Sequence, residues 1–324
     1  MSLLRSRALG ALLASCAAFP ALAADEVSFM IDWLPAGDKA AVYYGVQSGI
    51  FAKHDLDVTV MVGRGSSDVV TKLATGTADV GTGGLSALLQ AKAGGEVPVK
   101  ALASIYTKQP DAIFTYEGSG IEKLADVAGK KIATATFSSS NVSWPLVLES
   151  IGVDPASVEV LKVDPGALGP MLAAGRVDAT INWLTVAPAI SATLDQAGKT
   201  FKSHAWSDYG YEGYGLSLFV SETYLAENPE VVDRLLAAYQ EATAAAIADP
   251  KAAAEALKAM VPEVDVDIAI DQWTASIPLM VNEITEADGM GAITDARLAT
   301  SWAWVSKAQG LPEDALDLST VVAK

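Results

Sequence analysis

Residues 29–60 read FMIDWLPAGDKAAVYYGVQSGIFAKHDLDVTV, and they predict a strand, a loop, a helix and a second strand in one pass. The apolar run Phe29–Ile31 is the first strand. Asp38 can accept the free N–H groups of a helix that runs from about Lys39 to Ser48. Residues Leu56–Val62 then alternate between apolar and polar side chains, as a half-buried strand does. This β-loop-α-β pattern is typical of an α/β fold.

The loop of this unit brings side chains that suit a ligand to the carboxyl end of a strand. Asp32, Trp33 and Asp38 lie in it, beside the first N–H groups of the following helix. Open parallel sheets bind their ligands at this edge. We therefore expect a binding site beside this loop.

The same stretch resembles a known family. The matching residues are Asp32-Trp33-Leu34-Pro35, Tyr43-Tyr44, Gly49-Ile50-Phe51 and Leu56-Asp57-Val58, with further matches along most of the mature chain. They resemble the branch of bacterial periplasmic binding proteins that contains the thiamine-pyrimidine-precursor, riboflavin, alkanesulfonate and nitrate binders of ABC importers. The resemblance implies a type II periplasmic binding protein fold with two α/β lobes. Each lobe would be a mainly parallel sheet flanked by helices, and two hinge crossings would join them.

The length of 324 residues allows two lobes, each with its own core. An internal echo supports two similar lobes, because Leu73–Asp79 matches Leu172–Asp178. Crossings are expected near Thr107–Pro110 and Trp206–Gly215. The expected segments are a leader at 1–23, the first part of lobe 1 at 24–108, lobe 2 at 109–221, and a helical second part of lobe 1 at 222–324.

The amino-terminal segment has the anatomy of a secretory leader. Arg5 and Arg7 precede an apolar run, and Ala21-Leu22-Ala23 places small residues at a cleavage site. Cleavage after Ala23 predicts a periplasmic protein. The only cysteine, Cys16, lies in a tetrapeptide that also resembles a lipobox, so lipid anchoring is the alternative. Cleavage after Ala23 would leave no thiol for a disulfide or a metal site.

The chain is strongly acidic, with a formal charge of −17. Such a surface repels phosphate backbones and anionic lipid headgroups, and the sequence has no concentrated basic patch. Hydrophobic residues make up 51% and charged residues 19%, as in a well-packed globule. We expect a monomer without a nucleic-acid partner.

The sequence offers no catalytic set. His54 and His204 are the only histidines, and neither stands at metal-ligand spacing from other ligands. No Gly-x-Ser-x-Gly motif is present. A related fungal branch makes the thiamine pyrimidine from its own histidine and has a cysteine-rich motif. This chain has neither that cysteine motif nor a histidine in the opening helix. We predict that it is not an enzyme and needs no cofactor or metal. An exported enzyme with Asp32 and Asp38 as its acid-base pair is the rival.

Aromatic and polar residues converge instead on the predicted strand ends. A flat ring stacked on aromatic side chains gains about 0.5–1.5 kcal/mol beyond area burial. Carboxylates and hydroxyls can then fix its orientation. The candidate ligand-binding residues are Asp32, Trp33, Asp38, Tyr44, Gly84, Ser86, Tyr106, Ser138, Ser139, Asn141, Asp164, Trp183, Tyr211 and Tyr214.

The charges in these loops favour a neutral or amine-bearing heteroaromatic ligand. The loops contain aspartates but no Lys or Arg, and Lys39, Arg64 and Lys108 are merely nearby. The N–H groups of an aminopyrimidine could pair with Asp32 or Asp38 while the ring stacks on Trp33. A sulfonate, nitrate or phosphate would be expected to draw a cation, although helix N-termini could substitute.

The expected function is therefore capture of a small ligand by hinge closure, followed by delivery to the membrane subunits of an ABC importer. The preferred ligand is a heteroaromatic such as a thiamine pyrimidine precursor. An alkanesulfonate, nitrate or small aromatic acid is the alternative within the same fold. A sensor accessory that presents its ligand to a receptor is an alternative of another class.

Overall fold

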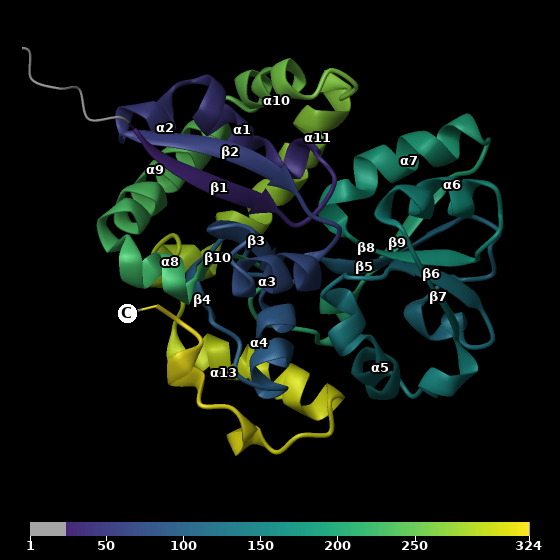
Figure 1. The fold of residues 1–324 in the computed structure, drawn as a ribbon. Helices are drawn as coiled ribbons and strands as arrows, with labels where there is room; N and C mark the ends of the chain where they lie inside the picture. The colour runs from purple at the N-terminus through teal and green to yellow at the C-terminus, as the bar shows by residue number, and fades with distance from the viewer. Residues whose placement is uncertain (1–23, 324) are drawn as a thin grey trace, which may run out of the picture.

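Two lobes, each built around one five-stranded mixed sheet, make up the molecule (Figure 1). The computed structural model describes residues 24–323. The expected leader, with its cleavage site and Cys16, lies outside the described residues. The two-lobed α/β architecture predicted from the sequence is confirmed.

The first sheet has the strand order β2-β1-β3-β10-β4. β1 pairs in parallel with β2 and β3, whereas β10 runs antiparallel between β3 and β4. Because β1 ends at Ile31, Asp32 follows directly at the carboxyl edge of the sheet. The strands are β1 (Asp25–Ile31), β2 (Leu56–Val62), β3 (Val80–Gly84), β4 (Val99–Ser104) and β10 (Leu216–Ser221).

The position of β10 places the boundary between the lobes before Leu216, and not at residue 221 as expected. The sequence analysis assigns Leu216–Ser221 to lobe 2, yet Leu216 pairs with Gly84 and Ser217 with Ser104 in the first sheet. All six residues of β10 are buried, because the strand fills the position between β3 and β4. The chain therefore returns to the first lobe before Leu216.

The second sheet has the order β7-β6-β8-β5-β9. β6 pairs in parallel with β7 and β8, and β5 is antiparallel to β8 and β9. Each sheet thus contains one antiparallel strand that directly follows a crossing between the lobes, β10 in the first and β5 in the second. The strands are β5 (Asp111–Tyr116), β6 (Lys131–Ala135), β7 (Glu159–Val163), β8 (Ala179–Trp183) and β9 (Phe201–Ala205).

Helices cover both faces of the first sheet. Phe29 points to the core beneath α1 and α9, whereas the neighbouring Met30 packs on the opposite side with residues of α3, α4 and α13. This alternation follows from the two-residue period of a strand. The helices of the first lobe are α1 (Ala40–Gln47), α2 (Ile50–Lys53), α3 (Ser66–Ala74), α4 (Leu85–Ala93), α8 (Glu222–Glu227), α9 (Pro229–Ala248), α10 (Pro250–Met260), α11 (Val266–Met280), α12 (Glu283–Asp288) and α13 (Asp295–Ala308). Those of the second are α5 (Ser140–Ser150), α6 (Leu168–Ala173) and α7 (Ala187–Gln196).

Two crossings connect the lobes, one from β4 to β5 and one from β9 to β10. α13 also touches both lobes. Trp302 packs in the core of the first lobe, whereas the ring of Trp304 lies edge-on to Tyr211 at 5.0 Å between centroids. Two tryptophans that are two residues apart leave a helix in different directions. Trp302 can therefore pack in the first lobe while Trp304 contacts Tyr211.

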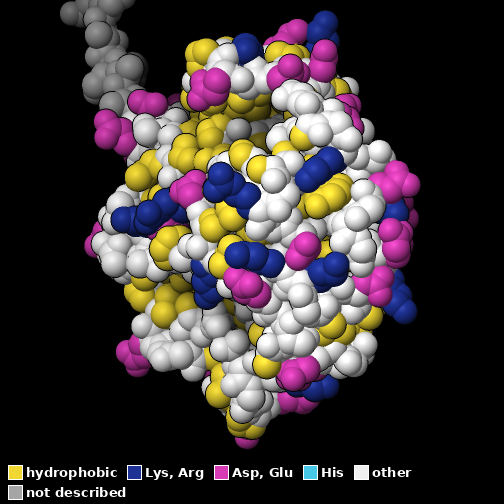
Figure 2. All heavy atoms as spheres, turned by 90° about the vertical axis from the view of Figure 1, so that its right-hand side faces the viewer, with side chains coloured by type: hydrophobic (Ala, Val, Ile, Leu, Met, Phe, Trp, Pro, Cys, Tyr) yellow, Lys and Arg dark blue, Asp and Glu magenta, His cyan; other side chains and the backbone are white. Residues whose placement is uncertain are grey.

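The surface of the second lobe carries charges of both signs. Figure 2 shows this face with Lys and Arg side chains interspersed among Asp and Glu. Within residues 24–323, no helix is long and apolar enough to cross a membrane.

Candidate functional site

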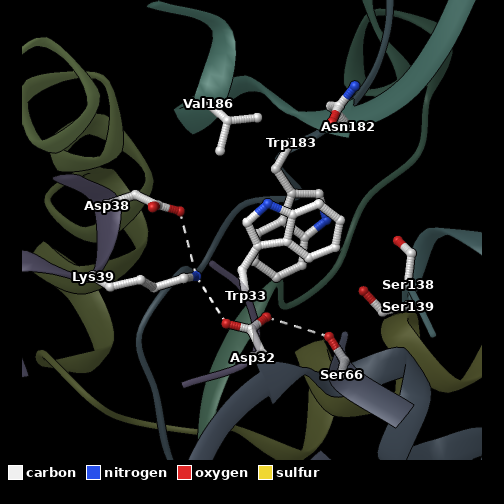
Figure 3. A pocket seen from close by; sticks show the side chains of 10 residues that line it. All are labelled: Asp32, Trp33, Asp38, Lys39, Ser66, Ser138, Ser139, Asn182, Trp183 and Val186. Atoms are coloured by element: carbon white, nitrogen blue, oxygen red, sulfur yellow. Dashed lines mark hydrogen bonds and ion pairs between the residues drawn. The ribbon is translucent and has the colours of Figure 1, made fainter. Parts of the chain in front are cut away.

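A small pocket, with a cavity volume of about 20 Å³ and named the inner pocket here, lies between the two lobes. The first lobe contributes residues from the end of β1, from the 3-10 turn η1 (Gly37–Lys39) and from the start of α3. The second contributes the loop before α5, the end of β8 and the 3-10 turn η5 (Leu184–Val186). Its lining residues, drawn in Figure 3, are Asp32, Trp33, Asp38, Lys39, Ser66, Ser138, Ser139, Asn182, Trp183 and Val186.

A buried ion cluster forms one wall of the inner pocket. Lys39 Nζ lies 2.8 Å from Asp32 Oδ1 and 3.3 Å from Asp38 Oδ2, and all three residues are buried (Figure 3). Burial by itself would lower the pKa of Lys39, but the two carboxylates outweigh it and raise that pKa above its usual value. Lys39 is therefore a fixed cation, and the cluster carries a net formal charge of −1.

The two carboxylates differ in how far they are satisfied. Asp32 also accepts long hydrogen bonds of 3.4 Å from the hydroxyls of Ser66 and Thr82. Asp38 Oδ2 accepts a hydrogen bond from Thr185 Oγ1 at 2.9 Å. Asp38 Oδ1 is buried and has no hydrogen-bond partner within residues 24–323. One strong acceptor of the ion cluster is thus buried and unpaired in a residue that lines the pocket.

Two tryptophans face the inner pocket, one from each lobe (Figure 3). Trp33 follows β1, and Trp183 ends β8. Lys39 Nζ lies 5.2 Å from the Trp183 ring centroid, within range of a cation–π interaction. Tyr106 is fully buried behind Trp183, with the rings edge-on at 6.1 Å. The inner pocket therefore has flat apolar walls, formed by Trp33 and Trp183, and an acidic edge, formed by Asp32 and Asp38.

The lobes touch directly around the pocket. Besides the bond between Thr185 and Asp38, the Ser67 N–H donates to the Phe137 carbonyl at 3.1 Å. Ser86 Oγ donates to the Ser139 carbonyl at 3.4 Å. A Cβ added to Gly84 would lie 2.4 Å from Ser139 Oγ, so only glycine allows this approach. The arrangement is that of two lobes closed on each other.

Six of the predicted site residues line the inner pocket, namely Asp32, Trp33, Asp38, Ser138, Ser139 and Trp183. Three more stand directly behind the lining. Gly84 approaches Ser139 and Trp183, Ser86 bonds the Ser139 carbonyl, and the Tyr106 hydroxyl donates to the Asp38 carbonyl at 3.4 Å.

The other predicted residues lie away from the lining and have structural partners. Asn141 accepts a hydrogen bond from Thr134 and donates to the Ala135 carbonyl, and Asp164 is exposed and caps the turn at Gly166. Tyr44 packs against the first lobe's core. Tyr211 is buried and donates to Ser143, and buried Tyr214 bonds Thr294 through its hydroxyl.

Lys39, Ser66, Asn182 and Val186 line the pocket but are missing from the predicted set. The expectation of a site without a cation is therefore wrong, because Lys39 is the last residue of η1 and turns inward between two carboxylates. The one sequence feature that could have indicated this role of Lys39 is its position next to Asp38. Ser66 is the first residue of α3.

The histidines are apart from the inner pocket. His54 bonds Glu241 at 2.9 Å, and His204 lies 3.4 Å from the Ile121 carbonyl. Across residues 24–323, no group of three or more His, Cys, Asp or Glu side chains could hold a metal ion.

Comparison with solved structures defines the fold family. The alkanesulfonate-binding protein SsuA from Xanthomonas axonopodis, bound to MOPS, superposes with a TM-score of 0.72 at 16% identity, over 92% of this chain and 98% of that one. The ligand-binding component of an ABC-type import system from Staphylococcus aureus gives a TM-score of 0.70 at 12% identity, over 92% and 96%. The chain therefore has the type II periplasmic binding protein fold, with its pocket between the lobes.

The chain belongs to the NMT1/THI5-like family, whose family model matches residues 37–253. A Haemophilus influenzae protein named for thiamine biosynthesis is 25% identical over 306 residues, 92% of this chain and 94% of that protein. A Brucella abortus binding protein is 29% identical over 206 residues, 63% of this chain and 62% of its own. A Saccharomyces cerevisiae protein named 4-amino-5-hydroxymethyl-2-methylpyrimidine phosphate synthase is 23% identical over 262 residues, which are 78% of this chain and 76% of that protein.

Proposed function

We propose that this protein captures a small heteroaromatic amine, of the aminopyrimidine class, between its two lobes and delivers it to an ABC importer. The observation that carries the proposal is Asp38 Oδ1, a buried acceptor without a partner in the part of the chain that the structure describes. An unpaired buried acceptor costs about 1–3 kcal/mol, and a ligand N–H donor would remove that cost. The names of the thiamine-related relatives support the same class of ligand.

The walls of the inner pocket suit a planar ring. Trp33 and Trp183 supply aromatic surface from opposite lobes, so a ring that contacts both would hold the lobes together. Aromatic contacts of this kind add about 0.5–1.5 kcal/mol beyond area burial. Binding and closure are then the same event, because the site is complete only when the lobes meet.

The charges of the inner pocket argue against an anionic ligand. Lys39 is the one cation among the lining residues, and it is already shared by Asp32 and Asp38. A sulfonate would therefore meet a net negative wall, which disfavours it relative to a neutral or protonated amine. The sulfonate ligands named for SsuA are properties of that protein.

We further propose binding without turnover. The acid-base candidates at the pocket, Asp32 and Asp38, both pair with the cation Lys39, and no histidine is among the described residues that line it. The synthase activity is named for the yeast relative, and incubation of this protein with its ligand should leave the ligand chemically unchanged.

The location and the partner are part of the proposal. The basic and apolar anatomy of residues 1–23 supports export with cleavage after Ala23, and cleavage at Cys16 with lipid anchoring is the alternative. The import-system neighbour supports delivery to an ABC importer. That the carrier acts as a monomer is part of the proposal.

Calorimetric titration tests the ligand. The chain from Ala24 onward is unfolded and refolded to remove carried-over ligand, then titrated with 4-amino-5-hydroxymethyl-2-methylpyrimidine and, separately, with alkanesulfonates. We expect binding of the pyrimidine and a loss of roughly tenfold or more in Asp38→Asn, because a hydrogen bond to a charged acceptor is lost. Tighter binding of the sulfonates than of the pyrimidine would overturn the proposed ligand class.

A control separates recognition by Asp38 from an effect of overall charge. Asp164 is an exposed carboxylate outside the inner pocket, so Asp164→Asn should leave the affinity unchanged. If both Asp→Asn variants weakened binding equally, the effect would be one of overall charge and not of Asp38.

A further inference from the structure

A second hollow, named the outer groove here, continues from the inner pocket toward solvent. It has a cavity volume of about 440 Å³ and shares Trp33, Asn182 and Val186 with the inner pocket. The inner pocket, with a cavity volume of about 20 Å³, is far smaller than the groove. A ligand seated between the lobes here would therefore extend past Trp33 into the outer groove.

Both lobes form the walls of the outer groove. α6 and α7 supply the wall from lobe 2, and the loop after β1 and the start of α11 supply the wall from lobe 1 (Figure 1). α7 and α11 contact each other, so the groove narrows as the lobes meet. Closure of the lobes would therefore enclose a substituent in the groove, just as it encloses the ring in the inner pocket.

Apolar residues predominate in the lining of the groove, although Asn182, Thr193 and Gln196 also contribute. Ala189 and Ile190 line it from α7, Gly169 from α6, and Leu34 from the opposite loop. Leu34 is 38% exposed at the rim of the groove. Apolar walls of this kind favour a substituent with an apolar body.

The charges of the groove have one sign. Among the described residues that line it, Glu263 and Asp265 are the ionisable ones, and no Lys or Arg is present. Asp265 caps α11 by accepting from the Ile268 N–H at 3.1 Å, whereas Glu263 is exposed beside it. An uncharged or cationic group would be accepted here, and an anionic one repelled.

We propose that the outer groove is a second binding compartment, and that the ligand is a two-part molecule: an aminopyrimidine in the inner pocket carrying an uncharged or cationic second group in the groove. This inference rests on the proposed function and extends it. On this proposal, α7 and Glu263 determine which of several related pyrimidines binds most tightly, whereas other residues hold the ring.

Three probes test it by calorimetry on the refolded chain. 4-Amino-5-hydroxymethyl-2-methylpyrimidine has the ring alone, thiamine joins such a ring to a cationic thiazolium, and thiamine monophosphate ends in an anion. We expect thiamine to bind at least about tenfold tighter than the single ring, with the monophosphate weaker than thiamine. Equal affinities for the single ring and thiamine would overturn the second compartment.

Variants locate the effect. Ala189→Phe, which fills the groove, should weaken thiamine binding by roughly tenfold and leave the single ring unaffected. Glu263→Gln should weaken thiamine but not the single ring. Ser191→Phe adds the same bulk to α7 outside the groove lining and should change neither.

The outcomes separate the two proposals. If the single ring binds and Ala189→Phe weakens both probes alike, the compartment is wrong while the proposed function stands. If neither pyrimidine binds the wild type, the proposed function fails and this inference fails with it. Ala192→Phe, also on the groove side of α7, replaces Ala189→Phe should that variant not fold.

Discussion

Thr185 of the second lobe donates a hydrogen bond to the Asp38 carboxylate of the first lobe at 2.9 Å. The same carboxylate holds Lys39 and keeps its other oxygen unpaired at the wall of the inner pocket. Asp38 therefore connects three things: the buried cation, the opposite lobe and the site proposed for a ligand donor. Contacts made only when the lobes meet stabilise the closed state selectively.

Thr185→Val should weaken ligand binding without weakening the fold of either lobe. The substitution keeps the shape of the side chain and removes one hydrogen bond to a charged acceptor, which we expect to lower affinity by about tenfold. Titration calorimetry measures the affinity, and small-angle scattering should show a larger radius of gyration without ligand. Unchanged affinity and radius would mean that this bond does not contribute to closure.

Gly84→Ala should hinder closure sterically. An added Cβ would lie 2.4 Å from Ser139 Oγ and 2.7 Å from Ser139 Cβ, so rotation of the hydroxyl alone cannot make room. We expect affinity to fall by roughly tenfold or more. Gly94→Ala is the matched control, because its Cβ would meet only carbonyl oxygens at 3.5 Å and beyond. A scattering profile of Gly84→Ala identical to wild type would contradict the steric account.

Lys39→Met should destabilise the first lobe strongly. It leaves Asp32 and Asp38 buried without their cation, and breaking a buried ion pair from one side costs about 3–5 kcal/mol. Urea denaturation measures the loss. The double variant Lys39→Met/Asp32→Asn removes one of the stranded charges and should recover part of it. A double variant no more stable than the single one would show that the loss comes from packing.

Asp111→Asn should flatten the dependence of stability on pH. Asp111 is buried, and burial raises the pKa of its carboxyl from 3.8 to about 6, with the Ser140 and Trp183 side chains partly opposing that rise. The folded state thus binds this proton more tightly than the unfolded state. The stability contributed is complete below about pH 4 and is lost as pH rises to about 6, by at most roughly 3 kcal/mol.

Denaturation at pH 4 and pH 7.5 checks this sign. The difference in unfolding free energy between Asp111→Asn and wild type should shift in favour of the variant at the higher pH. A difference that is constant between the two pH values would mean that Asp111 does not titrate differently in the folded protein.

The sequence predicted those parts of the molecule that depend on local pattern. The strand Leu56–Val62, the stop at Gly49 and the pocket loops around Trp33 and Trp183 follow from periodicity, turn residues and strand ends. The inward turn of Lys39 could not be predicted in this way. It depends on two carboxylates that come together only when β1 and η1 fold against each other.

Tyrosines were the weakest part of the site prediction. Tyr211 and Tyr214 stand in a segment rich in glycine, which suits a hinge, but composition does not say which way a ring points. In the structure both are buried and hydrogen-bonded through their hydroxyls, to Ser143 and to Thr294. Only long-range packing separates a ring that lines a pocket from one that supports it.

The position of β10 has a consequence for the order in which the chain can fold. Within its sheet β4 pairs only with β10, and its other edge meets Val322 through a bridge to Ala101. Both neighbours of β4 are therefore synthesised after the whole of the second sheet, whose strands form the continuous stretch 111–205. The second lobe can complete its sheet on the ribosome while β4 is still waiting for its partners.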